Sequence, residues 1–150
     1  MTQAITSKTS LYDQDLNLWL ENAIAQLKSG QLQDLDINNL IEELEGLAGR
    51  DRRELKNRLR TLLEHLLKRL YIDMPQEFNG WECTIREQRS QIELIIEQSP
   101  SLKSIWDQSF DGTWKSALKY VQEDYPQSQF PQTWQFSQDF NEMLNIKFWE

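Results

Sequence analysis

The residues best suited to chemistry are polar side chains expected where two helices meet. If the helices before and after a connection at 71–80 pack antiparallel, His65 lies near Arg86, and Arg58 can form an ion pair with Glu93. Such a junction could hold a small ligand or serve an enzyme reaction. Its candidate binding residues are Arg58, His65, Trp81, Thr84, Arg86, Gln88 and Arg89.

The small number of cysteines and histidines excludes several kinds of site. Cys83 and His65 are the only residues of their types, so the chain cannot form an internal disulfide or a Cys/His zinc site. A nucleophilic Cys83 would need His65 and an orienting group beside it, and nothing around Cys83 specifies them. No metal or cofactor is expected and no catalytic residue can be named, which favours a protein without enzymatic activity.

Charge bears on the kind of partner. The 150 residues contain 16 basic and 24 acidic side chains, a net charge of −8, which argues against nonspecific nucleic-acid binding. Residues 50–60 are locally basic, with six basic and two acidic side chains, so weak nucleic-acid binding there stays a third alternative. No apolar run approaches the roughly 20 residues of a membrane span. We expect a cytoplasmic protein without membrane association.

Apolar residues recur at steps of three and four, which predicts helices and no strands. We expect an all-α antiparallel bundle of four to five helices with one unusually long central helix. A loose lead-in over 1–10 precedes a single helical domain over 11–150. The expected helices cover 12–28, 37–70, 81–98, 100–125 and 137–144.

The helix predicted over 37–70 is the most informative element. Its apolar positions stay in phase across Gly46 and Gly49, which favours a continuous helix over a kink. Its length would be roughly 50 Å, against about 40 Å for the width of a compact domain of this size. We therefore expect either an elongated molecule or a partner at one end of this helix.

Five motifs occur in an order that resembles the family of domains of unknown function numbered twenty-nine, found mainly in cyanobacteria and other bacteria. The resemblance covers roughly 11–145 and implies an all-helical fold without supplying an activity. His65, Trp81, Thr84, Arg86 and Arg89 fall inside these motifs. The motifs are Leu11-Tyr12 with Asp15 and Leu18-Trp19-Leu20, then Leu40-Ile41-Glu42-Glu43-Leu44-Glu45, then Leu62-Leu63 with His65-Leu66-Leu67-Lys68, then Trp81 with Thr84-Ile85-Arg86-Glu87-Gln88-Arg89, then Ser99-Pro100-Ser101-Leu102.

The function expected from these observations is non-enzymatic. The chain is interpreted as a helical interaction or regulatory protein that binds a protein partner or associates with itself. The alternative is an enzyme or small-ligand binder that uses the junction of His65, Arg86 and Arg89. The aromatic residues after 130 are expected to cover the bundle as a strap, or to form an interaction patch if Phe148 and Trp149 are exposed.

Overall fold

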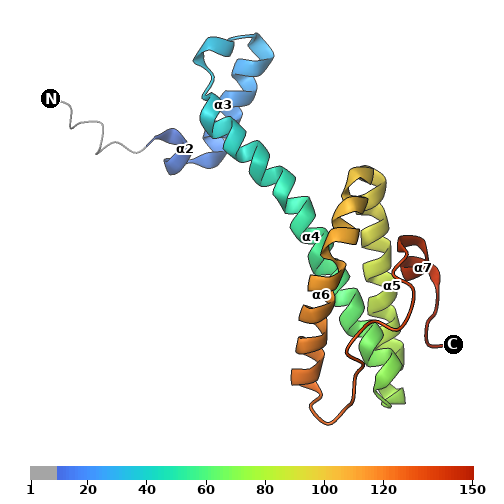
Figure 1. The fold of residues 1–150 in the computed structure, drawn as a ribbon. Coiled ribbons are helices and arrows are strands. Elements are labelled where there is room, and N and C mark those ends of the chain that lie inside the picture. Colours follow the sequence, from blue (N-terminus) through green and yellow to red (C-terminus); the bar gives the residue numbers. More distant parts are fainter. Residues whose placement is uncertain (1–9) are drawn as a thin grey trace. The chain divides into compact units, whose positions relative to one another are not determined.

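The protein is all-α over residues 10–150, which are the residues that the computed structural model describes (Figure 1). The expected lead-in over 1–10 lies outside them except for Ser10, whose side chain caps the first helix. No strand occurs in this part of the chain, and the predicted fold class is confirmed. The α-helices are α2 (Leu11–Gln14), α3 (Leu16–Ser29), α4 (Ile37–Tyr71), α5 (Pro75–Gln98), α6 (Lys103–Asp124) and α7 (Phe140–Asn145), with 3₁₀ turns η1 (Leu32–Asp34) and η2 (Pro100–Leu102).

The long helix forms as predicted. α4 runs for 35 residues through Gly46 and Gly49 without interruption. A glycine weakens a helix by about 1 kcal/mol relative to alanine, and two of them do not interrupt α4. Although α4 is long, none of the described helices is both long and apolar enough to cross a membrane.

Three predicted boundaries are wrong, and one of them is the start of the last helix, which begins at Phe140 and not at Ser137. The segment 12–28 divides at Asp15, whose carboxylate accepts a hydrogen bond from the Leu18 N–H at 3.0 Å and so caps α3. The presumed loop 71–80 is shorter than expected, because Pro75 starts α5 and Gly80 lies inside that helix. Proline suits this position, since a first-turn residue needs no donor for an intrahelical bond.

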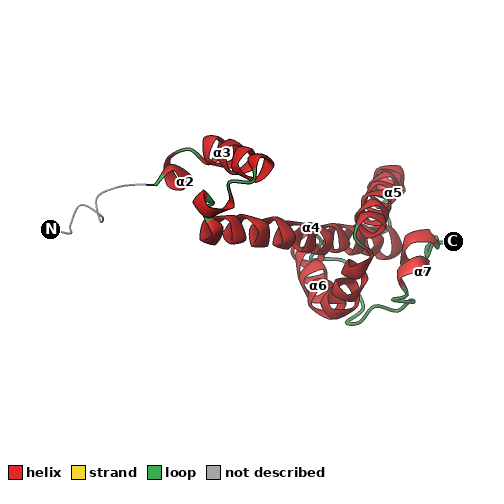
Figure 2. Ribbon diagram, turned by 90° about the horizontal axis from the view of Figure 1, so that it is seen from above, coloured by secondary structure: helices red, strands yellow, loops and turns green. Residues whose placement is uncertain are grey.

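The described chain forms two compact units. Unit 1 is Met1–Ala48 and unit 2 is Gly49–Glu150. The main hydrophobic core belongs wholly to unit 2, where the part of α4 from Leu55 onward packs with α5, α6 and the C-terminal segment (Figures 1 and 2). The single domain expected over 11–150 stays a prediction.

The C-terminal aromatic residues cover the core of unit 2, as the strap interpretation expected. Trp134 is buried, and Phe148 and Trp149 are half-buried against the core. Three indole N–H groups also find backbone acceptors: Trp106 donates to the Gln138 carbonyl, Trp114 to Gln132 and Trp134 to Ser137, at 3.3, 2.9 and 3.0 Å.

Unit 1 is held by fewer contacts. Among its described residues, Trp19 and Ala23 are the buried side chains. The Trp19 indole donates to the Asp36 carboxylate at 3.2 Å, and the Tyr12 hydroxyl donates to Glu43. The bond to Glu43 is the main reason that the pKa of Tyr12 is raised to about 12. These polar contacts fix α2 and α3 to the start of α4, but they leave most apolar side chains of the unit exposed.

Candidate functional site

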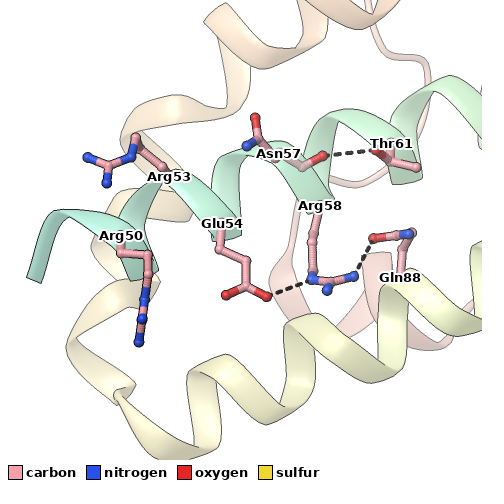
Figure 3. A pocket seen from close by; sticks show the side chains of 7 residues that line it. All are labelled: Arg50, Arg53, Glu54, Asn57, Arg58, Thr61 and Gln88. Carbon is pink, nitrogen blue, oxygen red and sulfur yellow. Dashed lines mark hydrogen bonds and ion pairs between the residues drawn. The ribbon is translucent and has the colours of Figure 1, made fainter. Parts of the chain in front are cut away.

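A polar hollow in unit 2 lies along α4, where α5 passes beside it (Figure 3). Its volume is about 400 Å³. Six of its lining residues are on α4, and one is on α5. They are Arg50, Arg53, Glu54, Asn57, Arg58, Thr61 and Gln88. Two of the predicted binding residues, Arg58 and Gln88, are therefore brought together here.

Arg58 is already neutralised within this hollow. Its Nε donates to Glu54 at 3.1 Å, and its Nη1 donates to the Gln88 side chain at 3.2 Å. The predicted ion pair between Arg58 and Glu93 is therefore wrong. Glu54 is one helical turn away on α4 and reaches the guanidinium first, since residues four apart share a helix face.

The two remaining arginines of the hollow have no ion pair among the described residues. Arg50 and Arg53 extend from α4 in different directions, and neither is aimed at the other (Figure 3). A small anion held by two guanidiniums needs both to converge on it. The hollow can therefore offer positive charge at separate points, as a contact with an acidic surface requires.

His65 has a structural hydrogen bond. Its Nδ1 donates to the Thr61 carbonyl at 2.8 Å, and the ring is half-buried. Desolvation by burial is the main reason that its pKa is lowered. No hydrogen bond or ion pair joins it to Arg86, which is exposed. The imidazole is thus set up to remain neutral within the bundle.

The lowered pKa of His65 predicts a loss of stability in acid. The unfolded chain binds a proton near pH 6.5, whereas the folded chain resists protonation, so the unfolded state carries more protons below that pH. The free energy of unfolding should therefore fall as the pH drops from 7 to 5. His65→Gln should show a smaller fall in urea unfolding measured at both pH values. An equal fall in both proteins would contradict a neutral, buried imidazole.

The other predicted site residues have separate surroundings. The Nη2 of Arg89 donates to the Ile146 carbonyl at 2.6 Å, and thus holds the C-terminal segment. Trp81 is buried in the core. The Thr84 hydroxyl donates to the Gly80 carbonyl at 3.3 Å within α5. These contacts give Arg89, Trp81 and Thr84 structural roles, so the structure does not gather the seven predicted residues at one site.

Arg69 was not among the predicted site residues, although its side chain contacts both α5 and the C-terminal segment. Its Nε donates to Glu82 at 2.7 Å, and its guanidinium lies 3.8 Å from the centre of the Phe78 ring and 5.5 Å from that of Trp149. These partners come from α5 and from the end of the chain. Because no short sequence motif joins such distant positions, sequence spacing gave no signal for this contact.

Residues that could hold a metal ion are not clustered. Within 10–150, no three side chains of the types His, Cys, Asp or Glu lie close enough to ligate one ion. Cys83 is exposed and has no disulfide partner.

Comparison with known proteins shows a family to which the sequence is similar. A family model described as domain of unknown function DUF29 matches residues 11–149. No curated protein matches the chain, and no solved structure does.

Proposed function

Since the chain belongs to the DUF29 family, whose description assigns no activity, we propose a function from the structure: the protein binds another protein through unit 1. The partner is a different protein or a second copy of this chain, and the role is one of interaction or regulation in the cytoplasm of a cyanobacterium or a related bacterium. A lone, exposed Cys83 suits a reducing compartment of this kind.

The observation that carries the proposal is the exposed apolar surface of unit 1. Nine large apolar side chains are exposed in the described part of this unit, against four in unit 2. Exposed apolar surface beyond scattered single residues marks interaction sites on proteins. The nine residues, which are between 43% and 58% exposed, are Leu16, Leu18, Ile24, Leu27, Leu32, Ile37, Ile41, Leu44 and Leu47.

The alternatives have less support. A ligand site at the junction of His65, Arg86 and Arg89 requires His65 and Arg89, which make separate contacts, and Arg86, which is exposed. Nucleic-acid binding through 50–60 would have to occur on a chain whose net charge is −8, which repels a polyanion. Protein binding through unit 1 accounts for the exposed apolar side chains of that unit, which neither alternative explains.

Copurification with a matched pair of variants tests the proposal. The tagged protein is expressed in the organism that encodes it, and the proteins that copurify are quantified by mass spectrometry. We expect at least one protein to accompany the wild type in stoichiometric amount and to be lost with Ile41→Gln/Leu44→Gln. The control is Leu94→Gln, which removes an apolar side chain of similar exposure from α5 in unit 2.

Self-association is followed on the same purified proteins by light scattering. A dimer of the wild type that the double variant loses and the control retains also supports binding through unit 1. The proposal is wrong if no protein and no second copy distinguishes the double variant from the control.

A further inference from the structure

The exposed apolar residues at the start of α4 form a regular stripe. Ile37, Ile41, Leu44 and Leu47 follow one another at steps of four, three and three, so they share one side of the helix. Each is about half exposed: 50%, 49%, 57% and 49%. We call these four residues the α4 stripe. Its spacing is that of a surface on which another helix packs.

Further along α4, apolar residues with the same spacing are covered by other helices of the protein. Leu55, Leu59 and Leu62 repeat the steps of four and three, and they are at most 1% exposed. They are buried in the core that α4 shares with the apolar faces of α5 and α6. A stripe with this spacing is thus matched in this protein by amphipathic helices, and an extended strand would not follow it.

Charge selects the kind of helix. Residues 10–48 contain eight carboxylates and a single basic side chain, Lys28. Glu45 lies four residues after Ile41 and therefore beside it on the helix surface. No ion pair involves Glu42 or Glu45 among the described residues. The stripe is thus accompanied by negative charge that the described part of unit 1 does not neutralise.

This charge disfavours a second copy as the occupant. Two copies of unit 1 packed stripe to stripe would bring carboxylates against carboxylates, and juxtaposed like charges weaken association. A helix with lysine or arginine beside its apolar face would meet the opposite charge instead. The basic residues 50–60 of another copy do not provide such a helix, because the apolar residues there, Leu55 and Leu59, are buried.

We propose that the α4 stripe binds a basic amphipathic helix of another protein, with Leu- or Ile-like residues on one face and lysine or arginine beside them. This inference rests on the proposed function and specifies the partner's chemistry. Apolar contact with the stripe supplies affinity, and the carboxylates of unit 1 select a basic helix over an acidic one.

Three synthetic peptides of about 18 residues, or five helical turns, test the proposal by calorimetric titration of the full chain. The first carries leucine at helical steps of three and four with lysine elsewhere. The second replaces every lysine with glutamate. The third has the composition of the first, with leucines spread around the helix. We expect saturable binding of the first peptide, with Kd lower by about tenfold or more than for the other two.

Variants locate the binding. Ile41→Gln/Leu44→Gln should raise the Kd of the first peptide by about tenfold or more, whereas Leu94→Gln should leave it unchanged. Glu42→Gln/Glu45→Gln should weaken that binding and reduce its dependence on salt. Circular dichroism on each variant verifies that the helices remain, since all five positions are on helix surfaces.

The outcomes separate this inference from the proposed function. Equal binding of the lysine and glutamate peptides, or binding that Ile41→Gln/Leu44→Gln does not weaken, would overturn the inference. So would a dimer that this double variant abolishes, because the stripe would then be covered by a second copy while protein binding through unit 1 still held. If no peptide binds and copurification also finds nothing lost in the variant, the inference and the proposed function fail together.

Discussion

Leu63→Ala is expected to lower the free energy of unfolding by about 2 to 5 kcal/mol, the range for deleting a fully buried leucine side chain. Leu63 is 0% exposed and lies on α4 in the centre of the unit 2 core. The loss combines the transfer of the removed methyl groups with the cavity that rigid neighbours leave. Urea unfolding of the wild type and the variant, followed by circular dichroism, measures the difference.

Leu44→Ala supplies the matched control on the same helix. Leu44 is 57% exposed, and its replacement is expected to change the free energy of unfolding by no more than about 0.5 kcal/mol. Because the described residues of unit 1 contribute nothing to the core of unit 2, this comparison uses the local opening free energy from hydrogen exchange at the start of α4. A loss there comparable to that at Leu63 would show that the α4 stripe is covered in the protein in solution. That result would count against unit 1 as an open binding surface.

Trp106→Ala is expected to cost about 3 to 5 kcal/mol of unfolding free energy. Trp106 on α6 is 1% exposed, and its ring centre lies 5.0 Å from that of Phe140 on α7 in an edge-on arrangement. The indole also donates to the Gln138 carbonyl at 3.3 Å. The substitution therefore removes both core volume and one of the hydrogen bonds that hold the C-terminal segment.

Trp106→Phe separates these two effects. Phenylalanine keeps an aromatic ring in the core but cannot donate to Gln138, so it should cost less than the alanine variant. Limited proteolysis should nonetheless cut the chain after 130 faster in Trp106→Phe than in the wild type. If the phenylalanine and alanine variants are equally destabilised and cut at the same rate, the ring contact with Phe140 does not stabilise α7.

The fold could be predicted because its strongest signals are local. Apolar spacing continued through Gly46 and Gly49, and α4 forms across them. The predicted helix boundaries are wrong where a single side chain begins or ends a helix independently of the apolar spacing. Asp15 divides the first helix by capping α3, and Pro75 begins α5 early because its missing N–H costs nothing in a first turn. Neither residue alters the apolar periodicity, so periodicity could not reveal them.

The candidate site was harder to predict, because its contacts join residues far apart in the sequence. Antiparallel packing correctly placed Arg58 opposite α5, but the register estimate gave Glu93 as its partner, whereas Arg58 donates to Gln88. Arg89 was assigned to binding, and it donates to Ile146 from a segment whose path the sequence did not indicate. The exposed state of the α4 stripe also had no sequence signal, because Ile41 and Leu44 have the same spacing as buried residues further along.

The confinement of the buried core to unit 2 has a consequence for cooperativity. The core cluster begins at Leu55 and contains none of the described residues of unit 1, so the buried apolar surface that makes melting cooperative belongs to unit 2. A single two-state transition then describes unit 2 alone. By linkage, a molecule that binds the α4 stripe stabilises the unit it touches. Its effect would appear as slower hydrogen exchange in α3 and the start of α4, with the melting temperature of unit 2 left where it was.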